Sequence, residues 1–87
     1  MIQLGDEVIW PEAEESHYHE HFMVLNIYPS HLLKNETGQG VLVALIEPAN
    51  HALFCEKMLG VHNADNERVR IEVPLNMLIL VVNRTLH

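Results

Sequence analysis

The clearest hydrophobic pattern in the chain lies in residues 68–82. Charged and apolar side chains alternate at its start, in the order Arg68, Val69, Arg70, Ile71, Glu72 and Val73. A period of two predicts a strand with one buried and one exposed face. Pro74 has no amide hydrogen to donate and ends that strand. Residues 75–78 then suit a single 3₁₀ turn, and the uniformly apolar residues 78–82 predict a closing strand.

Three further strands are predicted upstream. The first covers residues 7–10, and Pro11 closes it. The second begins at residue 19 or 20 and extends to residue 28, where Pro29 is expected to stop it. The third covers residues 41–47, between a glycine and a proline. Residues 12–16 are acidic and lack apolar periodicity, so we expect an exposed loop between the first two strands.

Residues 51–59 allow two interpretations. Asn50 could cap a short helix that ends at Gly60, with Leu53, Phe54 and other apolar side chains on one face. Alternatively, residues 48–50 form a hairpin turn and the chain continues as a fourth strand. The strand is slightly favoured because it continues the antiparallel meander.

Several segments together resemble SH3-like β-barrels. They are the turn and strand Gly5-Asp6-Glu7-Val8, the acidic first loop, two apolar central strands, and Val73-Pro74-Leu75-Asn76 before the closing strand. The resemblance implies one all-β domain over residues 1–87, a partly open barrel of five or six strands, with one short helix at 51–59 as an option.

The peptide-binding function of SH3 domains is not expected to carry over. That function uses a groove of aromatic side chains, whereas this chain has five aromatic residues, most of them at predicted core positions. RNA-binding small barrels, including the KOW type, share the shape. The charge of this chain argues against that use.

Charge narrows the possible partners. Twelve acidic and five basic residues give a net charge of −7 at pH 7. Phosphate contacts depend on Lys and Arg, so nucleic acid is an unlikely partner, and an anionic membrane would repel the chain. An acidic patch precedes the first basic residue and consists of Glu12, Glu14, Glu15 and Glu20. This patch could meet a basic protein partner, but a solvated acidic surface is the favoured explanation.

The remaining composition indicates a cytoplasmic protein. The apolar runs at 41–46 and 77–82 are far shorter than the ~20 residues of a membrane span, and no secretory signal is recognisable. The single cysteine, Cys55, fits a reducing compartment and, beside Leu53 and Phe54, a buried inert thiol.

A histidine cluster is the strongest candidate for metal chemistry. His17, His19 and His21 would face the same way on a strand, about 6.5–7 Å apart. Two neighbouring imidazoles at that spacing could share a zinc or nickel ion. All three would converge on one ion only if the strand bends or if a further group such as His31 or His62 joins. The alternative is a set of exposed histidines without a ligand.

No enzymatic activity is predicted, because the chain has no phosphate-binding glycine loop, nucleophile elbow or metalloprotease helix.

The closing strand suggests self-association. Its side chains are apolar on both faces, namely Leu78, Ile79, Leu80, Val81 and Val82. The outward set needs cover, which a second copy would supply in a homodimer. The sequence therefore predicts a small acidic interaction module that self-associates. A histidine-based metal- or small-ligand-binding protein is the alternative.

Overall fold

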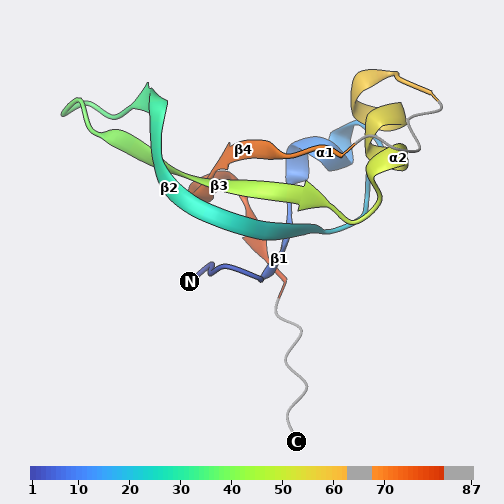
Figure 1. Ribbon diagram of the computed structural model, residues 1–87, viewed down its shortest axis with the longest axis horizontal. Coiled ribbons are helices and arrows are strands. Elements are labelled where there is room, and N and C mark those ends of the chain that lie inside the picture. The colour runs from blue at the N-terminus through green and yellow to red at the C-terminus, as the bar shows by residue number, and fades with distance from the viewer. Residues whose placement is uncertain (63–67, 82–87) are drawn as a thin grey trace, which may run out of the picture.

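Five antiparallel strands form one open sheet in the computed structural model, which describes residues 1–62 and 68–81 (Figure 1). The strands are β1 (Glu7–Ile9), β2 (Phe22–Lys34), β3 (Gly40–Pro48), β4 (Ile71–Pro74) and β5 (Ile79–Leu80). They are ordered β4-β3-β2-β1-β5 across the sheet. The helical elements are α1 (Pro11–Glu15), α2 (His51–Phe54), the π-helical turn η1 (Cys55–Leu59) and the 3₁₀ helix η2 (Leu75–Met77). The predicted mainly β class and strand number are confirmed.

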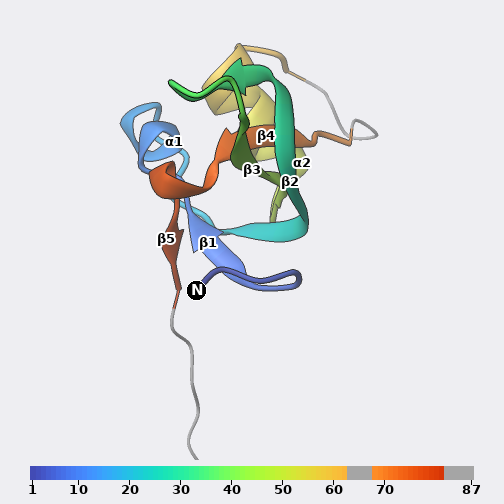
Figure 2. The same ribbon diagram turned by 90° about the vertical axis from the view of Figure 1, so that its left-hand side faces the viewer.

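The motif predicted for the last part of the chain is present as β4, η2 and β5. β5 pairs with β1, with Val8 opposite Leu80 and Ile9 opposite Ile79, so the last strand lies beside the first (Figure 2). β5 is shorter than the predicted strand 78–82, and Val82 lies outside the described residues. β4 also begins later than predicted. The burial of residues 68–73 nevertheless alternates as the sequence pattern indicated.

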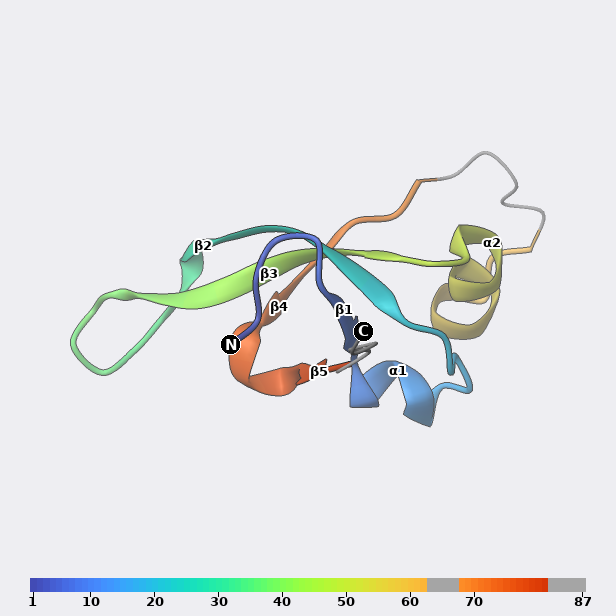
Figure 3. The same cartoon turned by 90° about the horizontal axis from the view of Figure 1, so that it is seen from below.

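β2 is longer than predicted, because it does not stop at Pro29. It continues to Lys34, and Pro29 lies opposite Leu42 of β3. β1 pairs with β2 only at Phe22 and Met23, so the distal half of β2 has β3 as its one partner among the described strands. A strand with a neighbour on one side only can accommodate the missing N–H of proline. The β2–β3 hairpin therefore extends beyond the rest of the sheet (Figure 3).

The predicted exposed loop at residues 12–16 was also wrong in part. Residues 11–15 form the one-turn helix α1, and Ala13 on this helix is fully buried. Pro11 occupies the first helical turn, where its fixed φ favours the helix and its missing N–H costs nothing. The prediction treated Pro11 as the end of a strand, although the same residue also begins a helix.

The alternatives for residues 51–59 are resolved in favour of a helix. Asn50 Oδ1 accepts a hydrogen bond from the Leu53 amide at 3.1 Å, which caps α2. Gly60 then ends η1 with a left-handed φ of 67°. Such a cap is a position where glycine carries no steric cost. The strand interpretation is therefore wrong, because capping at both ends favours the helix more than the meander favours a strand.

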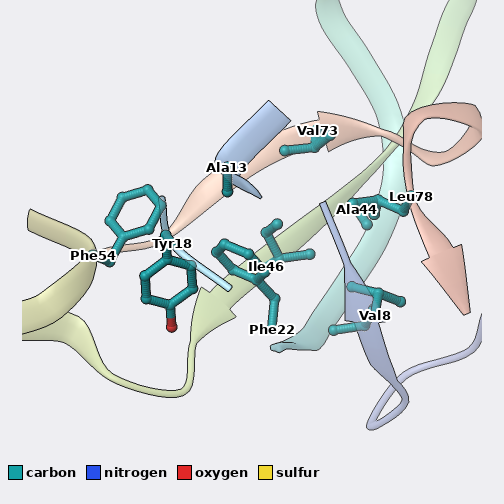
Figure 4. Close-up of a cluster of buried hydrophobic side chains, with 10 residues drawn as sticks. Val8, Ala13, Tyr18, Phe22, Ala44, Ile46, Phe54, Val73 and Leu78 are labelled. Carbon is teal, nitrogen blue, oxygen red and sulfur yellow. The ribbon is translucent and has the colours of Figure 1, made fainter. Parts of the chain in front are cut away.

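The core lies where the first part of β2 meets β1, β3, α1 and α2. Phe22, Tyr18 and Phe54 form an aromatic cluster in which ring centroids lie 5.2–5.7 Å apart (Figure 4). Tyr18, from the segment between α1 and β2, is 0% exposed. Each such ring contributes about 2–3 kcal/mol through burial, and the tilted and edge-on packing adds to that. Cys55 is buried beside Phe54, as expected.

Among residues 1–62 and 68–81, no helix is long and apolar enough to cross a membrane.

Candidate functional site

An open pocket of about 580 Å³ lies at the end of the sheet where β2 begins and β3 ends. Its polar wall contains three carboxylates and three imidazoles, from Glu7, Glu20, Glu47, His19, His21 and His51. Its apolar wall contains Phe22, Met23, Pro48 and Ala49. We call this site the acidic pocket.

The register of three strands places the two walls together. Glu7 of β1 lies opposite Met23 of β2, and Met23 lies opposite Glu47 of β3. Directly paired residues point to the same face, and neighbouring strands lie about 4.8 Å apart. Met23, 48% exposed, therefore presents an apolar surface between two carboxylates.

Among the described side chains, the carboxylate of Glu7 forms a hydrogen bond only with the imidazole of a histidine, His21. Its Oε2 lies 3.2 Å from Nδ1 of His21, and both side chains are about half exposed. No lysine or arginine pairs with Glu7 in that part of the chain. A neutral imidazole leaves the carboxylate charge in place, so Glu7 contributes a negative charge to the pocket at neutral pH.

Glu47 is already neutralised. Its Oε1 accepts from Arg68 Nη2 at 2.6 Å and lies 2.9 Å from His51 Nε2. His51 Nδ1 in turn accepts from the Val69 amide at 2.9 Å. Because Nδ1 is an acceptor here, the hydrogen of the neutral ring is on Nε2 and is donated to Glu47. These contacts tie α2 and the segment before β4 to the end of β3.

Glu20 is the other carboxylate without a cationic partner among the described side chains. It lies near the phenol of Tyr18, whose oxygen accepts from the Asn50 amide at 3.2 Å. Burial raises the pKa of Tyr18 above its ordinary value of 10.0, and the negative charge of Glu20 raises it further. Glu7 and Glu20 thus give the pocket a net negative charge.

The three histidines predicted to bind one metal ion do not converge on a common point in the structure. They lie in the segment before β2 rather than on a strand. His17 has a φ of 70°, its ring centroid is 6.4 Å from that of His19, and it does not line the pocket. His19 lies 3.9 Å from Glu14, whereas His21 contacts Glu7. Within residues 1–62 and 68–81, no group of three or more His, Cys, Asp or Glu side chains is arranged to hold a metal ion.

The predicted acidic patch is divided between two places. Glu12, Glu14 and Glu15 are exposed on α1, whereas Glu20 lines the pocket. The first two also lie in the first turn of α1, where carboxylates interact favourably with the helix N-terminus. Part of this patch therefore has a structural explanation.

The predicted self-association strand offers limited exposed surface. Leu78 is buried in the core, and Leu80 and Val81 are partly buried. Ile79 is 53% exposed. Among the predicted interface residues that the structure describes, the outward apolar surface is thus a single side chain.

The comparisons with known proteins gave no match to a family model, to a curated protein or to a solved structure. The resemblance to SH3-like barrels therefore stays a prediction.

Sequence reasoning missed Glu7, Met23, Glu47 and His51 as site residues. No sequence signal placed Met23 on the exposed face, because residues 22–25 are all apolar, and only the structure shows that Phe22 and Val24 on either side of it are buried. The pairing of Glu7, Met23 and Glu47 depends on the register of three strands, which no local pattern specifies.

Proposed function

We propose that this protein is a small non-enzymatic binding module whose acidic pocket receives a lysine or arginine side chain of a partner protein, in the cytoplasm. The supporting observation is the position of Glu7 and Glu20 beside the exposed Met23, without a lysine or arginine partner among the described residues. A long basic side chain can lay its aliphatic stem on an apolar surface and place its charge on a carboxylate. The net charge of −7 favours the approach of a basic partner and disfavours nucleic acid.

The test is an NMR titration of labelled protein with a short peptide that contains one arginine, compared with the same peptide carrying glutamine instead. We expect shifts for the amides of Glu7, Met23 and Glu47. We also expect binding to weaken from 0.05 to 0.5 M salt, because the Debye length falls to a few ångströms.

Matched variants locate the site. Glu7→Gln combined with Glu20→Gln should weaken binding at least about tenfold, equivalent to 1.4 kcal/mol. Glu56→Gln removes the same kind of charge from η1, outside the pocket, and should have no effect. Equal binding of both peptides, or of the double variant and the wild type, would contradict the proposal.

A triple variant tests the alternative acidic surface. Glu12→Gln, Glu14→Gln and Glu15→Gln together remove the α1 carboxylates. If this variant loses binding and the pocket variant does not, the partner binds α1 instead.

Self-association through the closing strand is a second part of the proposal, supported by the exposure of Ile79. β5 lies at the end of the strand order, so one side has no strand partner in the described residues. A second copy could pair along it and cover Ile79. Ile79→Lys should then abolish a dimer detected by analytical ultracentrifugation, while Ile79→Val should retain it.

A further inference from the structure

The β2–β3 hairpin ends in an arm, residues 29–42, that projects beyond the body of the sheet (Figures 1 and 3). The arm exposes three leucines, with exposed fractions of 87% for Leu32, 47% for Leu33 and 54% for Leu42. Lys34 is the last residue of β2 and is exposed beside them. Exposed leucines on a projecting element are typical of an interaction surface.

Leu32 and Leu33 lie in a bulge of β2. Pro29 pairs with Leu42 and Lys34 pairs with Gly40, so residues 30–33 of β2 lie opposite a single residue of β3. The buried Ser30 hydroxyl accepts from the amides of Leu32 at 3.1 Å and Leu33 at 2.9 Å. Bulges of this kind commonly re-aim side chains toward a functional position.

The tip of the arm is ordered by its own hydrogen bonds. Asn35 Oδ1 accepts from the amides of Thr37 at 3.0 Å and Gln39 at 2.9 Å. These contacts and those of Ser30 fix the backbone without help from the core. A surface held in its binding conformation loses less entropy when it binds.

We propose that the arm of one copy occupies the acidic pocket of a second copy, with Lys34 directed at Glu7 and Glu20 and the leucines packed on Met23. This inference rests on the proposed function and names the partner as a second copy of this chain. Charge complementarity supports it, because Lys34 meets two carboxylates that lack a cation among the described residues. The apolar parts also match, since the leucines and Met23 are all exposed in the single chain.

The arm cannot enter its own pocket. Phe22 and Met23 at one end of β2 line the pocket, and the arm is the other end of this 13-residue strand. The contact therefore joins different surfaces of two copies. Such a contact either repeats head to tail into chains or rings, or closes as a pair in which the two copies exchange arms.

Glu36 allows a substitution that should strengthen association instead of weakening it. It lies in the tip of the arm, two residues after Lys34, and would approach the same carboxylates. Glu36→Gln removes a like-charge repulsion and should strengthen association, whereas Lys34→Glu should weaken it at least about tenfold.

The decisive experiment is sedimentation of the full chain with two variants and their mixture. The arm variant combines Leu32→Ser with Lys34→Glu, and the pocket variant combines Glu7→Gln with Glu20→Gln, so that the substituted arm and the substituted pocket have no complementary charges. We expect the wild-type mass to rise with concentration to that of a dimer or of a larger assembly, and each variant alone to be monomeric. An equimolar mixture should form one-to-one dimers only, because the mixture contains one intact arm and one intact pocket.

Controls separate folding from binding. All four substituted residues are exposed, and thermal unfolding should show both variants to be folded. Lys57→Glu makes the same charge change on η1 and should associate like the wild type. A wild type that stays monomeric at millimolar concentration overturns the inference, as does association that survives in both variants alone. The latter result would place the contact elsewhere, for example at Ile79.

The arm variant also distinguishes this failure from failure of the proposed function. It keeps an intact pocket that no arm can fill, so it should bind the arginine peptide as described above. If it binds the peptide while the wild type never associates, only the second-copy inference is wrong. If it does not bind the peptide, the proposed function itself is wrong.

Discussion

The two ends of β2 are stabilised in different ways. At the first end, Phe22 and Val24 are buried between neighbouring strands and an aromatic cluster. At the other end, the arm has one neighbouring strand and its leucines are exposed. Burial orders the first end, whereas side-chain hydrogen bonds of Ser30 and Asn35 to the backbone order the second. An element can thus be well defined without contributing to the core, and such an element is available for binding.

The largest expected effect is the loss of stability when a buried side chain at the first end of β2 is removed, compared with an exposed one at the other end. Phe22→Ala should lower the free energy of unfolding by about 3–5 kcal/mol, because it removes a ring that contacts Tyr18, Phe54 and Trp10. Leu32→Ala, at the other end of the same strand, should change it by less than about 0.5 kcal/mol. Urea unfolding monitored by tryptophan fluorescence measures both. Similar losses for the two variants would show that the arm is part of the core.

An intermediate effect is expected at Gly40, where the arm leaves no space for a side chain. A Cβ at this position would collide with the Ser30 carbonyl oxygen and lie 3.0 Å from Pro29 Cβ. Backbone atoms cannot move aside easily, so Gly40→Ala should destabilise the protein by about 1–3 kcal/mol. The neighbouring Gln39→Ala is the control and should stay within about 0.5 kcal/mol. If Gly40→Ala is equally mild, the bulge is not held as the structure indicates.

The smallest expected effect is a loss of thermal stability at alkaline pH. Burial raises the pKa of Tyr18, and a hydrogen bond to Glu72 raises the pKa of Tyr28, both from 10.0. A raised pKa in the folded state gives stability that is complete below pH 10 and is lost as the pH rises through the folded pKa. Melting temperatures should therefore fall above pH 10.

Two conservative variants show how much of this loss of stability above pH 10 comes from each tyrosine. Tyr18→Phe should remove the larger part, because Tyr18 is fully buried, and Tyr28→Phe the smaller part, because Tyr28 is only partly buried. Melting curves from pH 8 to 11 measure the dependence. An unchanged profile in Tyr18→Phe would mean that its phenol is not the group responsible.

Periodicity was sufficient for much of the fold. The mainly β class, the third strand, and the β4–η2–β5 order follow from alternation and from the position of Pro74. These features depend on residues close in sequence, whose effects a local pattern can show. Where two local effects competed, the prediction was wrong. Pro11 ends a strand and also begins α1, and residues 51–59 fit both a capped helix and a strand that continues the meander.

The site depended on distant residues. The sequence by itself determined the acidic charge, the histidine-rich segment and most of the strands. Only the tertiary structure decided that Glu7, Met23 and Glu47 form one row, that Glu47 is neutralised by Arg68, and that His17 lies outside the pocket. Strand register and the packing of α2 set these relations, and both arise from contacts between residues far apart in the chain. A charge can be read from one residue, but its partner depends on the fold.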